Sequence, residues 1–145
     1  MRSIHRRAIV SILLLACASA AAATPPATGL GQSWPNASDV SASPGYHVYV
    51  FEKEGVRYVQ VNDASGTVRG AIAYTDANTV LDLPIGVDAS RWVTVTDGAA
   101  PDAAKQVYQD DSVTVIVAPQ PDGSARMMLA PGDCDNPAQC SIRVQ

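Results

Sequence analysis

The sequence predicts an all-β fold, either a small antiparallel β-sandwich or a partly closed barrel built from two meanders. Short runs rich in β-branched and aromatic residues recur from Tyr46 onward, and clusters of turn-forming residues separate them. No long segment with the helical period of 3.6 follows the N-terminal region. The chain has 145 residues, 47% of them hydrophobic, which is enough for one domain with a core.

The first meander is expected to contain three strands, at 46–51, 56–61 and 68–74, joined by turns at 52–55 and 62–66. Successive side chains of a strand point to opposite faces. One face of the first strand then carries Tyr46, Val48 and Val50, and the other carries His47, Tyr49 and Phe51. Because both faces are largely apolar, this strand is expected either to pack on both sides or to present Tyr49 and Phe51 to a partner.

Shorter strands are expected at 80–83 and 92–96. Segment 102–108 has two interpretations, a helical turn that begins beside Pro101 or a strand at 105–109. The clearest strand is 112–117, with Val113, Val115 and Val117 on one face and Ser112 and Thr114 on the other. A turn at 119–124 separates it from strands at 126–130 and 140–144.

Residues 1–23 have the features of a signal peptide. Three arginines precede an apolar stretch at 8–16, and small residues follow it. The apolar stretch is far shorter than the roughly 20 residues that a membrane-spanning helix needs. The segment therefore predicts export to the periplasm or the medium, followed by a flexible arm at 24–45 rich in Pro, Gly and Ser and a β domain at 46–145.

Cys17 offers an alternative to simple cleavage. The segment from Leu14 to Cys17 resembles a bacterial lipoprotein box, in which the cysteine becomes the lipidated first residue. Lipidation would anchor the protein in the bacterial envelope. Contact with a membrane is expected only through this anchor.

The other two cysteines, Cys134 and Cys140, are expected to form a disulfide. They are an even pair in an exported chain, and Asp135, Asn136 and Pro137 between them favour a turn. Their spacing is not that of a redox dithiol, and no second cluster of Cys or His accompanies them. No metal site is predicted here.

The charge of the chain argues against nucleic acid as a partner. The formal net charge is -4 at pH 7, whereas nucleic-acid binders show a basic face to phosphates. Removal of residues 1–23 leaves 7 basic and 14 acidic groups. This excess of acid keeps a domain soluble and favours cationic partners, although a solvated surface is the simpler interpretation.

Catalytic groups are scarce. His47 is the one histidine beyond residue 23, and no Gly-x-Ser-x-Gly motif accompanies it. Asp110 and Asp111 could act as a carboxylate pair only in a turn, where aspartates usually cap backbone amides. No glycine-rich phosphate loop or dinucleotide fingerprint is present. The sequence predicts neither an enzyme nor a cofactor.

Binding is the remaining expectation, with a protein or a surface component of the envelope as partner. The candidate contact residues are Trp34, Tyr49, Phe51, Asp110 and Asp111. Three alternatives stay open. The domain could be an inhibitor or immunity-type protein whose acidic loops enter an envelope hydrolase, or it could be a hydrolase that uses Asp110, Asp111 or His47. It could also be a structural lipoprotein without a specific ligand.

Overall fold

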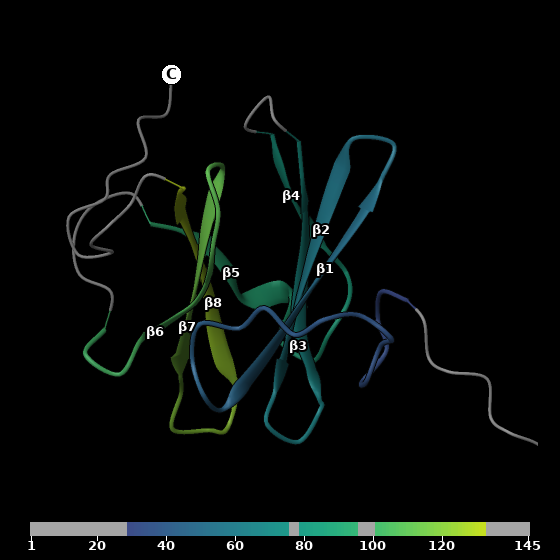
Figure 1. Cartoon of the computed structure of the whole chain (residues 1–145). Helices are drawn as coiled ribbons and strands as arrows, with labels where there is room; N and C mark the ends of the chain where they lie inside the picture. Colours follow the sequence, from purple (N-terminus) through teal and green to yellow (C-terminus); the bar gives the residue numbers. More distant parts are fainter. Residues whose placement is uncertain (1–28, 76–78, 96–100, 133–145) are drawn as a thin grey trace, which may run out of the picture.

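The computed structural model describes residues 29–75, 79–95 and 101–132 and contains two four-stranded sheets that face each other (Figure 1). Sheet one has the strand order β1-β2-β3-β4 and sheet two the order β5-β8-β7-β6. The elements are β1 (Tyr46–Lys53), β2 (Val56–Asp63), β3 (Val68–Tyr74), β4 (Val80–Leu83), the 3₁₀-helix η1 (Ala89–Arg91), β5 (Trp92–Thr94), β6 (Lys105–Gln109), β7 (Val113–Pro119) and β8 (Ala125–Pro131). The predicted all-β fold is confirmed, and the sheets do not close into a barrel.

The first meander is confirmed and gains β4 as a fourth strand. β1 and β2 meet through a two-residue turn, because Lys53 pairs directly with Val56. Both turn residues have positive φ, 54° at Glu54 and 77° at Gly55. Those angles are typical of a type I′ turn, whose twist matches the twist of the two strands.

Sheet two differs from the antiparallel expectation at one pairing, since β5 runs parallel to β8. The chain enters β5 from sheet one through η1, so no hairpin sets the direction of β5. Residues 105–109 form a strand, which decides between the two interpretations of that segment in favour of β6. Both faces of β7 are buried from Val113 to Ala118.

The core between the sheets takes side chains from both. Trp92 of β5 packs across it onto Gly70 of β3. A Cβ atom at Gly70 would lie 3.0 Å from the indole Nε1, so the glycine makes room for the ring. The same core contains Val48, Val59, Val61, Ile72, Tyr74, Val107, Val113, Val115, Val117, Met127 and Leu129.

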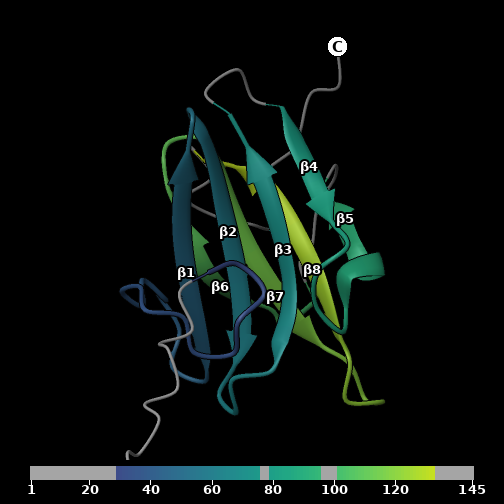
Figure 2. The same ribbon diagram turned by 90° about the vertical axis from the view of Figure 1, so that its right-hand side faces the viewer.

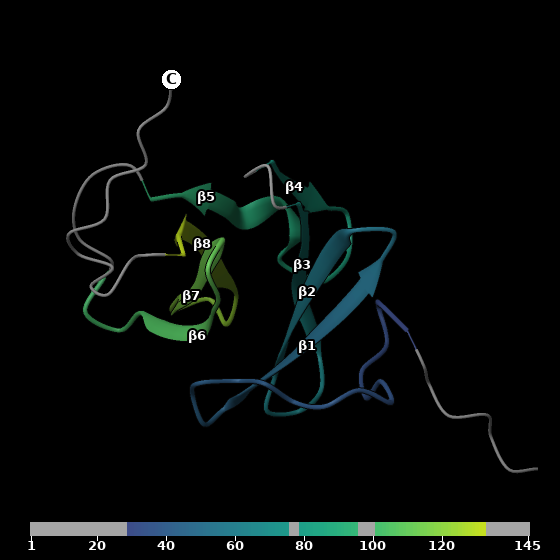
Figure 3. The same cartoon turned by 45° about the horizontal axis from the view of Figure 1, so that its top comes forward.

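Residues 29–45 run in front of β1 and β2 on the outer face of sheet one (Figure 2). Further along, the Val40 amide donates to the Val48 carbonyl at 2.9 Å, and the Ala42 amide donates to the Val107 carbonyl at 2.8 Å. Val48 belongs to β1 and Val107 to β6. Residues 39–42, called the strap below, therefore join the edge strands of the two sheets on one side of the molecule (Figure 3).

Several sequence predictions fall outside the described residues. They are the signal peptide at 1–23, lipidation at Cys17, the disulfide between Cys134 and Cys140, and the strand at 140–144. Within the described ranges, no helix is long and apolar enough to cross a membrane.

Candidate functional site

Trp34 lies on the outer face of sheet one, beside His47 and Gly66. Its side chain is 53% exposed although the indole rests against the backbone of Gly66. A Cβ atom at Gly66 would lie 2.5 Å from the indole ring. The ring of His47 stands edge-on to Trp34, with centroids 5.1 Å apart. The indole therefore packs against Gly66 and His47, while about half of the residue is open to solvent.

Two buried amide side chains of β2 hold the segment that carries Trp34. Gln60 and Asn62 both have 0% exposure, although they project from the outer face of the sheet. Gln60 accepts a hydrogen bond from the Gly31 amide at 2.6 Å and donates to the Gln32 carbonyl at 2.7 Å. Asn62 donates to the Ser33 carbonyl at 2.6 Å. These bonds fix the three residues before Trp34.

His47 is fixed from the strap. Its Nδ1 lies 2.7 Å from a carboxylate oxygen of Asp39. The other oxygen of Asp39 accepts hydrogen bonds from the amides of Ser41 and Val48, each at 2.9 Å. Burial raises the pKa of the Asp39 carboxyl, but the Val48, His47 and Ser41 hydrogen bonds outweigh it and hold the pKa below its usual value.

The structure places Tyr49 beside His47, but little of Tyr49 is accessible to solvent. Its ring stacks on His47 with centroids 6.5 Å apart, and the residue is only 5% exposed. Phe51 lies on the same face of β1, two residues further along, and is half-buried opposite Tyr58. We call Trp34, His47 and Tyr49 the aromatic cluster.

Asp110 lies at the opposite end of β2 from the aromatic cluster, in the turn between β6 and β7. Its Oδ2 accepts hydrogen bonds from the hydroxyls of Tyr74 and Tyr108 and from Arg57. Its Oδ1 accepts the amides of Ser112 and Val113, both at 2.9 Å. Asp111 is exposed beside it. The two neighbouring carboxylates thus occupy different environments.

The Asp110 contacts change the pKa values of three groups. Burial raises the pKa of Asp110, but the hydrogen bonds from Tyr74, from the two amides and from Tyr108 lower it further than burial raises it. Burial and the hydrogen bond to Asp110 raise the pKa of Tyr74. The pKa of Tyr108 is raised as well, chiefly by burial. At neutral pH the group is an ionised carboxylate surrounded by neutral hydroxyls.

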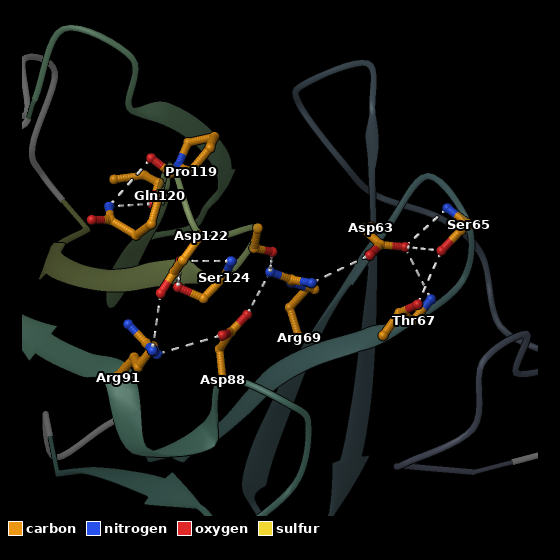
Figure 4. A network of polar contacts seen from close by, with 12 residues as sticks. Asp63, Ser65, Thr67, Arg69, Asp88, Arg91, Pro119, Gln120, Asp122 and Ser124 are labelled. Atoms are coloured by element: carbon orange, nitrogen blue, oxygen red, sulfur yellow. Dashed lines mark hydrogen bonds and ion pairs between the residues drawn. The ribbon is translucent and has the colours of Figure 1, made fainter.

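A second polar network, which sequence patterns do not indicate, surrounds Arg69 (Figure 4). Its guanidinium lies 2.8 Å from Asp88 and 3.6 Å from Asp63, and it donates to the Gly123 carbonyl at 2.8 Å. Asp88 is only 2% exposed. Gly123 belongs to the β7–β8 turn, so Arg69 connects the two sheets.

A shallow pocket of about 200 Å³ opens beside Arg69. It is lined by Tyr46, Asp63, Arg69, Pro119, Gln120, Gly123, Ser124 and Ala125. Two carboxylates already compensate the charge of Arg69, so this pocket offers little attraction to an anion. Among the residues that the structure places, no group of three or more His, Cys, Asp or Glu side chains could hold a metal ion.

Comparison with known proteins found no match to the chain among protein-family models, curated proteins or solved structures.

Of the residues predicted to bind, Trp34 and Tyr49 come together, and Phe51 lies on the same face. Asp110 and Asp111 lie apart from them. The roles of Gln60 and Asn62 were not anticipated. The signal in the sequence that could have indicated these roles is the position of two amide side chains among apolar residues of one strand. A buried amide side chain needs hydrogen-bond partners.

Proposed function

We propose that the protein is an exported, non-catalytic binding domain whose partner is an envelope protein or another surface component of the envelope. The surface around Trp34 is the proposed contact. The single observation that supports this most is that hydrogen bonds from two buried amide side chains hold the three residues before Trp34, while about half of Trp34 is exposed.

The exposure of Trp34 and the order of the segment that carries it both favour binding. Tryptophan is enriched among residues whose truncation costs a complex about 2 kcal/mol or more. A side chain that is already ordered loses less conformational entropy on binding than a mobile one. Burying Gln60 and Asn62 without partners would be unfavourable, so their bonds to residues 31–33 stabilise the presented conformation.

The environment of Asp110 supports a non-catalytic role. A carboxylate that acts as nucleophile or general base needs a lone pair directed at substrate. Five donors already occupy the two oxygens of Asp110. The carboxylate therefore has a structural role, because its hydrogen bonds connect residues of the two sheets.

The finer expectations from the sequence belong to the same proposal. Export through residues 1–23, or anchoring through Cys17, would place the domain in the envelope or the medium. A disulfide between Cys134 and Cys140 fits that oxidising location. The two sheets would then form an open sandwich with a cross-linked C-terminal segment.

The test is affinity capture from envelope extract with the full chain, comparing the wild type with Trp34→Ala. We expect saturable capture of one partner and at least a tenfold loss of affinity in the variant, which corresponds to about 1.4 kcal/mol. Arg126→Ala is the control, because Arg126 is an exposed residue of β8 that lies outside the aromatic cluster.

Equal affinity of Trp34→Ala and the wild type would contradict the proposal, and so would equal losses in Trp34→Ala and Arg126→Ala. Circular dichroism of each variant confirms that the fold is retained. Catalytic turnover of an envelope polymer that Asp110→Asn abolishes without unfolding would instead establish the hydrolase alternative.

A further inference from the structure

The two lateral sides of the molecule differ in how their strand edges are covered. The strap donates hydrogen bonds to β1 and β6 on one side. The opposite side is formed by β4, η1 and β5 (Figure 3). Of the six large hydrophobic residues that are exposed in the described parts of the chain, four lie on this side. These four are Val80, Leu81, Val87 and Val93.

The hydrogen-bonding pattern of β4 directs the amide and carbonyl groups of alternate residues away from β3, toward the open edge of sheet one. The Thr75 amide donates to the Thr79 carbonyl across the β3–β4 connection. Hydrogen-bonded pairs alternate with non-hydrogen-bonded pairs along an antiparallel ladder. Leu81 and Leu83 therefore direct their amide and carbonyl groups toward β3, whereas Val80 and Asp82 direct theirs toward the open edge. In the described parts of the chain, no hydrogen bond covers that edge.

Asp82 gives this edge its charge. It is one of three acidic residues in the described strands, and the other two, Glu52 and Asp63, each lie within ion-pair distance of an arginine. Asp82 is exposed and has no ion pair among the described residues. A strand added beside β4 would gain most by placing a basic side chain next to this carboxylate.

The outer face of sheet one favours an apolar side chain on a strand that is added beside β4. Register places four residues in one row across the sheet, Phe51 beside Tyr58, then Ala73, then Leu81. Leu81 ends the row at the open edge and is 60% exposed. An apolar side chain on an added strand would extend this row by one position and cover Leu81.

We propose that the β4 edge is a strand-addition site for an extended peptide segment of a partner protein, in which apolar and basic residues alternate. Main-chain bonds to Val80 and Asp82 would give affinity, and contacts with Leu81 and Asp82 would give specificity. This site is separate from the surface around Trp34 and does not depend on it.

A second copy of the chain fits this edge less well. Antiparallel pairing of two β4 strands that sets Leu81 against Leu83 also sets the two Asp82 side chains directly opposite each other. Like charges directly opposite destabilise such a pair. The acidic net charge of the chain adds to that repulsion.

The experiment titrates the full chain with two capped octapeptides, one alternating valine and lysine and the other alternating valine and glutamate, and follows backbone amides by NMR. We expect saturable shifts at Val80 and Asp82 with the lysine peptide and affinity at least tenfold weaker with the glutamate peptide. Asp82→Lys should reverse the preference. Asp102→Lys, which changes an exposed carboxylate in a turn, should leave it unchanged.

Three results would overturn the proposal. The first is an absence of saturable shifts at Val80 and Asp82 with either peptide. The second is a preference that Asp82→Lys and Asp102→Lys alter equally, which indicates nonspecific attraction. The third is strong protection of the Val80 and Asp82 amides from hydrogen exchange before peptide is added, because the edge would then be covered by the chain itself or by a second copy.

Discussion

Tyr74 donates a hydrogen bond to Asp110 and thereby ties the last residue of β3 to the β6–β7 turn of the other sheet. The opposite end of β3 is tied in a comparable way, since Arg69 donates to the Gly123 carbonyl in the β7–β8 turn. One strand therefore connects sheet one to sheet two at both of its ends. The apolar core between the ends supplies the burial, and the two polar ties fix how the sheets lie across it.

Asp110→Asn should destabilise the protein by about 3 kcal/mol at pH 7, because five donors lose an ionised acceptor. The size of this loss of stability should depend on pH in the acid range. The folded pKa of Asp110 lies below its unfolded value of about 3.9, so its contribution is present above that pH and is lost as the pH falls through the folded pKa. Urea titrations from pH 7 to pH 2 measure this. The variant should show a flatter acid limb than the wild type, and Asp111→Asn serves as the neighbouring exposed control.

Tyr74→Phe tests the same tie from the alkaline side. The folded pKa of Tyr74 is raised, so its stabilising effect is present below the unfolded pKa of about 10 and is lost as the pH rises toward the folded pKa. Wild-type stability should therefore fall above about pH 10 more steeply than that of the variant. At pH 7 the variant should lose about 1.5–3 kcal/mol, the usual range for a hydrogen bond to a charged group. Identical alkaline limbs for the two proteins would show that Tyr74 titrates freely.

Arg69→Met should cost about 3–5 kcal/mol, because it leaves the buried carboxylate of Asp88 without its closest cation. Arg91 also approaches Asp88, at 3.7 Å, but its side chain is 47% exposed. Arg91→Met is therefore expected to cost less than about 1 kcal/mol. Chemical denaturation of both variants measures the contrast. Similar losses in the two would mean that Asp88 is stabilised mainly by its surroundings rather than by Arg69.

The strands could be predicted from the sequence because alternation and turn residues are local signals. The row of Val113, Val115 and Val117 needs only a period of two, and Gly55 signals a turn within residues 52–55, although the structure confines that turn to Glu54 and Gly55. Each of these features lies within a few neighbouring residues.

The polar ties between the sheets and the hydrogen bonds that hold residues 31–33 on β2 could not be predicted, because each depends on residues far apart in the sequence. Asp110 is 53 residues from Arg57, and Gln60 is 28 residues from Gln32. The parallel pairing of β5 with β8 depends on a crossover between sheets, for which the sequence has no local pattern. Trp34 stood out as an isolated aromatic residue, but Gly66, which forms its seat, reads in the sequence only as a turn glycine.

Gly86→Ala should destabilise the fold by more than 1 kcal/mol beyond what its backbone angle explains. Gly86 has a φ of 105°, and a Cβ atom there would lie 2.6 Å from the backbone of Arg69. Gly45→Ala is a matched control, because Gly45 has a φ of 101° and nothing within 4 Å of the added atom. The difference between the two variants in urea denaturation isolates the steric contact from the cost of the left-handed conformation, which is about 1 kcal/mol.

Gly66→Ala should move the indole of Trp34 away from its position against residue 66, while the tryptophan itself is retained. The added Cβ would lie 2.5 Å from the indole, and a φ of 85° strains any side chain at this position. Gly55→Ala imposes a similar strain, at a φ of 77°, with open space around the new atom. We expect the indole N–H resonance of Trp34 to shift in Gly66→Ala and to stay in place in Gly55→Ala.

If partner binding depends on the position of the Trp34 ring as well as on its presence, Gly66→Ala should weaken capture nearly as much as Trp34→Ala does. Full binding by Gly66→Ala together with a shifted indole resonance would show that the position of the ring is unimportant.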